Sequence, residues 1–73
     1  MNRRYWTDDE LNALRHGFEF HVGTPWQRAV EIVADAGTVR SVAVSPDQWA
    51  HIAAIVGTRT AEQCAKRLQT ERL

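Results

Sequence analysis

The sequence contains little cysteine, glycine or proline, and it has no excess of charge of either sign. A single cysteine among 73 residues excludes an internal disulfide and a cysteine-rich zinc site. Nine Lys and Arg residues against nine Asp and Glu residues give a formal net charge of zero. This balance argues against a strongly basic nucleic-acid clamp, whose affinity comes mostly from cations that neutralise phosphates. No apolar run approaches the length of a membrane span.

The chain length predicts a single domain over residues 1–73, because neither half could form a core of its own. Such a small domain leaves little room for a deep catalytic cleft. Ser41 and Ser45 lack a plausible His–acid partnership, and the three histidines lack the spacing of metal ligands. Cys64 occupies an apolar helical position, which indicates a buried rather than a reactive thiol. We therefore expect a protein that is not an enzyme and that needs no metal or cofactor.

Four helix starts are marked by capping boxes, in which a Ser or Thr is followed three residues later by Glu or Gln. The hydroxyl accepts from the third helical N–H, and the Glu or Gln side chain accepts from the N–H of the cap. Two of the starts also place a proline directly after the cap, where a missing N–H costs nothing. The four boxes are Thr7 with Glu10, Thr24 with Gln27, Ser45 with Gln48, and Thr60 with Gln63.

The apolar spacing predicts an all-α fold with helices over about 8–22, 25–36, 46–56 and 61–72. Between the second and third, the segment 38–44 is β-branched and lacks a helical period. We expect an extended connector there, with a short strand as the alternative. The last two helices are joined only by Gly57-Thr58-Arg59, a length that suits a helix-turn-helix. Glycine also follows three of the four helices, as is common at helix ends: Gly23, Gly37 and Gly57.

These residues resemble the Myb/SANT family. The opening YWTDDE of residues 5–10, followed by Leu14 and Phe18, is similar to the family's first helix, W-T-x-x-E followed by leucine. The longer segment from Trp49 to Arg67, WAHIAAIVGTRTAEQCAKR, is similar to its second half, W-x-x-I-A followed by G-x-R-T-x-x-Q-C-x-x-R. The resemblance implies a three-helix bundle in which 46–56 and 61–72 form the helix-turn-helix.

Two departures from the family pattern shape the expected fold. Trp49 follows Trp6 at a much greater distance than the family's first two tryptophans, which predicts an insertion over 24–45 containing the helix 25–36. A register through Trp26 would instead need a helix across Ser45-Pro46, which proline disfavours. The insertion should pack onto the core, or else form an exposed patch for a partner. The family's third tryptophan is replaced by Leu68, and the expected core is Trp6, Leu14, Phe18, Trp49, Ile52, Ala53, Cys64 and Leu68.

Resemblance to a Myb repeat implies that helix 61–72 could enter the major groove of double-stranded DNA. Repeats that read DNA commonly have lysine before the Gln-Cys pair and asparagine on the second turn beyond it, where this chain has Glu62 and Thr70. The resemblance also suggests that Arg67 pairs with Glu10, the alternative being two solvated charges. The candidate DNA contacts are Arg3, Arg4, Arg59, Lys66 and Arg72.

The acidic start of helix 8–22 complements the helix dipole, and it could also form a patch that meets basic histone tails, as in SANT-type modules. The candidate protein contacts are Asp8, Asp9 and Glu62. We expect a SANT-like binding module of a chromatin- or transcription-associated protein in the nucleus. Its partners would be histone tails or subunits of a complex, with neither a membrane nor a small-molecule substrate. Binding of double-stranded DNA through helix 61–72 is the alternative.

Overall fold

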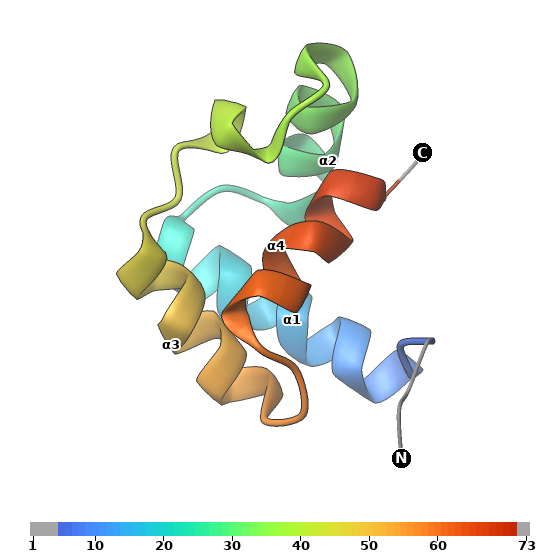
Figure 1. Cartoon of the computed structure of the whole chain (residues 1–73), viewed down its shortest axis with the longest axis vertical. Coiled ribbons are helices and arrows are strands. Elements are labelled where there is room, and N and C mark those ends of the chain that lie inside the picture. The colour runs from blue at the N-terminus through green and yellow to red at the C-terminus, as the bar shows by residue number, and fades with distance from the viewer. Residues whose placement is uncertain (1–4, 72–73) are drawn as a thin grey trace.

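A computed structural model of the chain describes residues 5–71, and this part is helical without a strand (Figure 1). The four α-helices of this part lie within about two residues of the predicted ranges, so the all-α class is confirmed. None of the described helices is long and apolar enough to cross a membrane. The elements are α1 (Asp8–Val22), α2 (Trp26–Ala36), the 3-10 helix η1 (Val39–Val42), α3 (Pro46–Val56) and α4 (Ala61–Thr70).

Three of the four predicted capping boxes are formed, at Thr7, Ser45 and Thr60, and each is reciprocal. The box predicted at Thr24 is wrong, because Pro25 and not Thr24 occupies the N-cap position of α2 and provides no side-chain hydrogen bond. A tertiary contact stabilises this helix start, since the Trp26 backbone N–H donates to Glu19 Oε2 at 2.9 Å. Three of the helices end at the predicted glycines, all with left-handed φ: Gly23, Gly37 and Gly57.

The segment 38–44 is not extended, so that prediction is wrong. Thr38 caps a short 3-10 helix, its hydroxyl accepting from the Arg40 backbone N–H at 3.3 Å, and Ala43 then turns the chain with a left-handed φ of 52°. The side chains of Val39 and Val42 pack against the core. The segment therefore bends because its valines are anchored inward while its polar residues stay in solvent.

Gln69 of α4 fastens this bent segment to the bundle. Its Oε1 accepts from the Val39 backbone N–H at 2.7 Å, and its Nε2 donates to the Gly37 carbonyl at 3.0 Å. One amide side chain thus satisfies a backbone donor and a backbone acceptor some thirty residues earlier in the chain. The end of α2 and the start of η1 are held against α4 by this contact.

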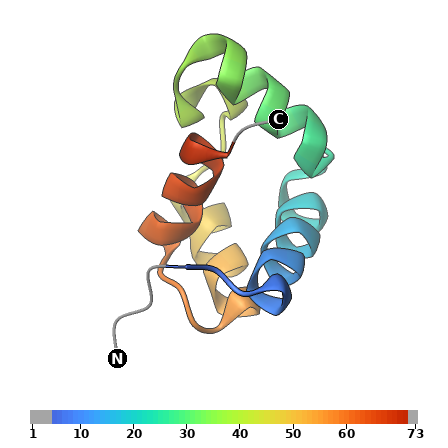
Figure 2. The ribbon, with the colours of Figure 1, turned by 90° about the vertical axis from the view of Figure 1, so that its right-hand side faces the viewer.

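α1 and α3 form the most extensive helix pair in the fold, and they run antiparallel. At one end of the pair, Gln48 Nε2 donates to the His21 carbonyl at 3.0 Å. At the other end, the Thr58 hydroxyl donates to the Glu10 carboxylate. α4 packs against α3, and α2 lies across one end of the bundle formed by α1, α3 and α4 (Figure 2).

The buried core agrees with most of the expected one. Of the predicted residues, Trp6 and Ala53 are only half-buried and pack at its edge. Trp6 precedes the first residue of α1 and lies at the end of the helix bundle, where the Arg59 guanidinium covers its indole ring at 4.8 Å from the centroid. The other predicted core residues are all buried: Leu14, Phe18, Trp49, Ile52, Cys64 and Leu68.

The segment 25–44 enlarges this core, as predicted. Trp26 is 5 % exposed, and its ring meets Phe18 edge-on with 5.3 Å between the centroids. The Phe18 ring also lies 5.8 Å from the Trp49 ring, measured between centroids. Phe18 is therefore the centre of an aromatic cluster that joins α2 to α1 and α3. The aliphatic residues that α2 buries beside it are Ala29, Val30 and Val33.

Candidate functional site

A buried ion pair joins the first turn of α1 to the turn before α4. Glu10 is 6 % exposed and Arg59 is 9 % exposed. Arg59 Nε donates to Glu10 Oε2 at 3.1 Å, and Arg59 Nη2 donates to Glu10 Oε1 at 3.3 Å. The same Nη2 donates to the Tyr5 carbonyl at 2.8 Å, while the guanidinium covers the Trp6 ring. Arg59 therefore fixes the segment before α1, the start of α1 and the α3–α4 turn relative to one another.

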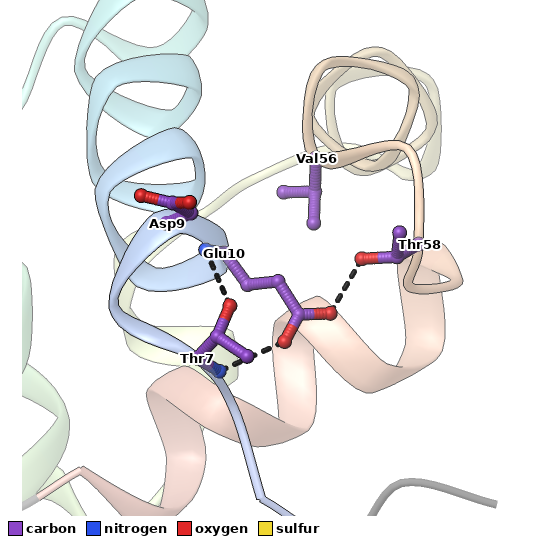
Figure 3. A pocket seen from close by; sticks show the side chains of 5 residues that line it. All are labelled: Thr7, Asp9, Glu10, Val56 and Thr58. Carbon is purple, nitrogen blue, oxygen red and sulfur yellow. Dashed lines mark hydrogen bonds between the residues drawn. The ribbon is translucent and has the colours of Figure 1, made fainter.

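Glu10 accepts further hydrogen bonds, which keep its carboxyl group ionised. The Thr58 hydroxyl donates to Oε2, and the Thr7 backbone N–H donates to Oε1 at 2.8 Å (Figure 3). These two bonds, with those from Arg59, lower the pKa of Glu10 to about 2, against desolvation, which acts in the opposite direction. The sequence did not single out Thr58, although its hydroxyl makes the largest contribution to this shift.

This ion pair changes the roles expected of two arginines. The pairing of Arg67 with Glu10, suggested by the family resemblance, is wrong, because Arg59 forms that pair and Arg67 Nη2 lies 3.1 Å from Glu71 Oε2. The chain passes α1 closely in the α3–α4 turn, whereas Arg67 comes nearly two helical turns later on α4. Arg59 was also a candidate DNA contact, yet its donors are directed into the protein.

The exposed side of α4 carries balanced charge. Lys66 and Glu62 are both exposed there, one helical turn apart, with Thr70 beyond Lys66. Lys66 is the candidate DNA contact that the described residues 5–71 place on the surface. The candidates Arg3, Arg4 and Arg72 lie outside the described residues.

The three candidate protein contacts, Asp8, Asp9 and Glu62, are all exposed. Asp9 borders an open hollow of about 350 Å³ between the first turn of α1 and the end of α3. Glu62 lies on α4, outside the lining of this hollow. Asp8 and Asp9 are consecutive in the first turn of α1, and the structure does not bring Glu62 into the lining of the hollow beside them. The hollow is lined by Thr7, Asp9, Glu10, Val56 and Thr58 (Figure 3).

Cys64 is fully buried, as predicted for a core thiol. Burial raises the pKa of the Cys64 thiol to about 11, which the charge of Arg59 opposes only in part. A thiol in this environment stays protonated and is a poor nucleophile at neutral pH. Within residues 5–71 no group of three or more His, Cys, Asp or Glu side chains could hold a metal ion.

The hydrogen bonds to Glu10 predict that its carboxyl group titrates at a lower pH than usual, and that removing a donor raises this pH. Because the folded-state pKa lies near 2 and the ordinary value is 4.5, the stability that the carboxylate contributes is complete above about pH 4.5 and is lost as the pH falls toward 2. A pH titration followed by the NMR shift of the Glu10 carboxyl carbon should have its midpoint near 2. In Thr58→Val the midpoint should rise, because the hydroxyl that donates to Glu10 Oε2 is gone. A midpoint near 4.5 in the unsubstituted protein would contradict the buried pair.

Comparison with known proteins gives no match to the chain, whether with protein-family models, curated proteins or solved structures. The resemblance to the Myb/SANT family therefore depends on the residues quoted above.

Proposed function

We propose that this chain is a SANT-like module that binds protein partners in a nuclear chromatin or transcription assembly. In this proposal α1, α3 and α4 correspond to the three family helices, and α2 with η1 is the insertion between the first and the second. The observation that carries the proposal is the position of Arg59. Its guanidinium is bound to Glu10 and Tyr5 in the interior, which leaves α4 with a charge-balanced outer side.

A helix that reads DNA in the major groove needs long donors directed at guanine and adenine edges, and cations beside the phosphates. On α4, the positive charge of Lys66 is offset by Glu62, four residues earlier on the same side. Gln69, which could otherwise approach a base, is bound to the backbone of Val39 and Gly37. These contacts favour a protein partner over a DNA partner.

The acidic start of α1 supports the same proposal independently of α4. Asp8 and Asp9 are exposed, and Asp9 borders the hollow whose wall includes the ionised Glu10. A basic partner such as a histone tail would find complementary charge there. Complementarity of this kind gives specificity and fast association more than raw affinity.

Duplex DNA is the second candidate, because Lys66 is exposed on the helix that would enter the groove. A paired NMR titration of isotope-labelled protein separates the two. With a basic histone-tail peptide we expect shifts at Asp8, Asp9 and Glu62, and with generic duplex DNA at low salt we expect none. Shifts at Lys66 that appear with DNA and weaken steeply as salt rises would overturn the proposal.

Two matched variants give this titration a control. Asp9→Asn removes an exposed carboxylate and should weaken binding of the histone-tail peptide severalfold. Lys66→Gln removes an exposed cation of α4 and should leave binding of the peptide unchanged. Loss of peptide binding in Lys66→Gln but not in Asp9→Asn would contradict a role for the acidic start of α1.

A further inference from the structure

The outer side of α1 and α3 exposes large apolar side chains. Among the described residues, the exposed large hydrophobic side chains are Tyr5, Phe20 and Ile55. Phe20 of α1 is 82 % exposed and Ile55 of α3 is 46 % exposed. Two of these three residues, Phe20 and Ile55, thus lie on the solvent-exposed side of the α1–α3 pair.

Ring and side-chain contacts connect these residues into one surface. The Phe20 ring meets His21 edge-on at 5.0 Å, and His21 stacks on His51 of α3 at 5.3 Å between centroids. One helical turn after His51, Ile55 packs on Gly17, where an added Cβ would lie 3.2 Å from Ile55 Cδ1. We call this surface the α1–α3 face: Gly17, Phe20, His21, His51 and Ile55.

Carboxylates stand at both ends of the α1–α3 face. Asp9 shares a stripe of α1 with His16 and Phe20, at the helical spacings of seven and eleven residues. Asp47 lies one turn before His51 on α3, and it is the only Asp, Glu, Lys or Arg in Pro46–Val56. Because the helices are antiparallel, Asp9 and Asp47 fall at opposite ends of the pair.

This charge pattern decides between two possible occupants. A second copy of the chain would place its own carboxylates against Asp9 and Asp47. Its α1–α3 face has no Lys or Arg that could pair with them. A partner segment with cations at both ends and apolar side chains between them would match both the charge and the apolar centre. The hollow beside Asp9 suits one such cation, because a lysine could lay its methylene stem on Val56 with its ammonium group near the carboxylate.

We propose that the α1–α3 face binds an amphipathic helix of a partner protein, with apolar anchors on Phe20 and Ile55 and basic residues near Asp9 and Asp47. Asp9 and Phe20 are separated by about 16 Å along α1, at 1.5 Å per helical residue, and Asp47 lies at the same end of the helix pair as Phe20, because its neighbour Gln48 donates to the His21 carbonyl. The bound helix therefore carries its basic residues about three turns apart, with its apolar stripe between them. This inference rests on the proposed role in protein binding and names the partner's chemistry.

A synthetic helical peptide with one leucine stripe and lysines at both ends is a suitable probe. Titrated into isotope-labelled protein, it should shift the amides of Gly17, Phe20, His51 and Ile55. A peptide of the same composition with the leucines scrambled around the helix, and one with glutamates in place of the lysines, should bind at least about tenfold more weakly. Equal binding of all three peptides would overturn the inference.

Variants of the protein locate the binding surface. Phe20→Ala and Ile55→Ala should each weaken binding of the leucine–lysine peptide about tenfold, the effect of losing an apolar anchor. Tyr5→Ala is the matched control, because Tyr5 is as exposed as Phe20 but lies off the face, and it should leave the affinity unchanged. Melting followed by circular dichroism should show that all three variants remain folded.

The other outcomes separate this inference from the proposed function. Shifts confined to Asp8, Asp9 and Glu62, with unchanged affinity in Phe20→Ala, would overturn the α1–α3 face as the binding site and would leave a protein-binding role intact. A concentration-dependent dimer in sedimentation that Phe20→Ala abolishes would overturn the inference in favour of a second copy. DNA-induced shifts at Lys66 would instead overturn the proposed function.

Discussion

Replacing Trp26 with alanine is expected to unfold the domain or bring it close to unfolding. The substitution removes a ring that is 5 % exposed and that meets Phe18 edge-on at 5.3 Å. Deleting a buried aromatic ring typically destabilises a protein by about 3–5 kcal/mol, because a cavity remains. A chain of 73 residues has a total stability of roughly 4–11 kcal/mol. The loss should be visible in urea and thermal unfolding followed by far-UV circular dichroism.

The matched control for Trp26→Ala is Phe20→Ala, which removes another aromatic ring, from the surface of α1. Phe20 is 82 % exposed, so its loss should change the free energy of unfolding by no more than about 0.5 kcal/mol. If Trp26→Ala melted at the same temperature as the unsubstituted protein, α2 would be a peripheral cover and not part of the core. The pair of variants thus tests whether the segment 25–44 is an integral part of the fold.

Helix limits could be predicted from the sequence because their signals are local. At Thr7, Ser45 and Thr60, the cap and the residue that returns to it lie within one turn. No distant contact is needed to form them. The start of α2 departs from this rule, because a carboxylate of α1 and not Thr24 receives the first free N–H. A bond between residues seven positions apart in two different elements has no signature in a capping pattern.

Contacts between elements could not be predicted in the same way. Arg59 and Arg67 are both candidates for Glu10 by charge, and only the path of the α3–α4 turn decides between them. The bend at 39–42 likewise depends on other elements, because Val39 and Val42 pack on the core and Gln69 of α4 accepts from the Val39 backbone N–H. In each case the deciding contact joins residues about thirty or more positions apart.

The sequence could predict which charged residues are exposed, but it could not predict which exposed residues lie next to one another. The exposure of Asp8, Asp9 and Glu62 agrees with their charge. The sequence did not predict that Phe20 and Ile55 belong to a binding surface. The helical period of the apolar residues identifies the buried side of each helix, but it does not show where apolar residues outside that side lie relative to one another. Their proximity across α1 and α3 depends on the antiparallel packing and on the close approach at Gly17. That juxtaposition could be found only in three dimensions.

Replacing Arg59 with glutamine is expected to lower the melting temperature by more than roughly 10 °C, since each kcal/mol corresponds to about 4–8 °C in a domain of this size. The substitution removes the guanidinium that donates to Glu10 and Tyr5 and covers Trp6. Removing one member of a buried ion pair is strongly destabilising, because the other charge stays in the interior. Thermal unfolding at neutral pH measures the effect directly.

Arg28→Gln is the matched control, because Arg28 lies 3.5 Å from Glu31 in a pair whose side chains are 66 % and 45 % exposed. A surface pair of this kind contributes about 0–1 kcal/mol, so the melting temperature should change little. Arg59→Lys should be intermediate, since lysine keeps the charge but cannot donate through a planar fork. Equal melting temperatures for Arg59→Gln and Arg28→Gln would mean that Arg59 is not a structural arginine, and it would return Arg59 to the set of residues free to contact DNA.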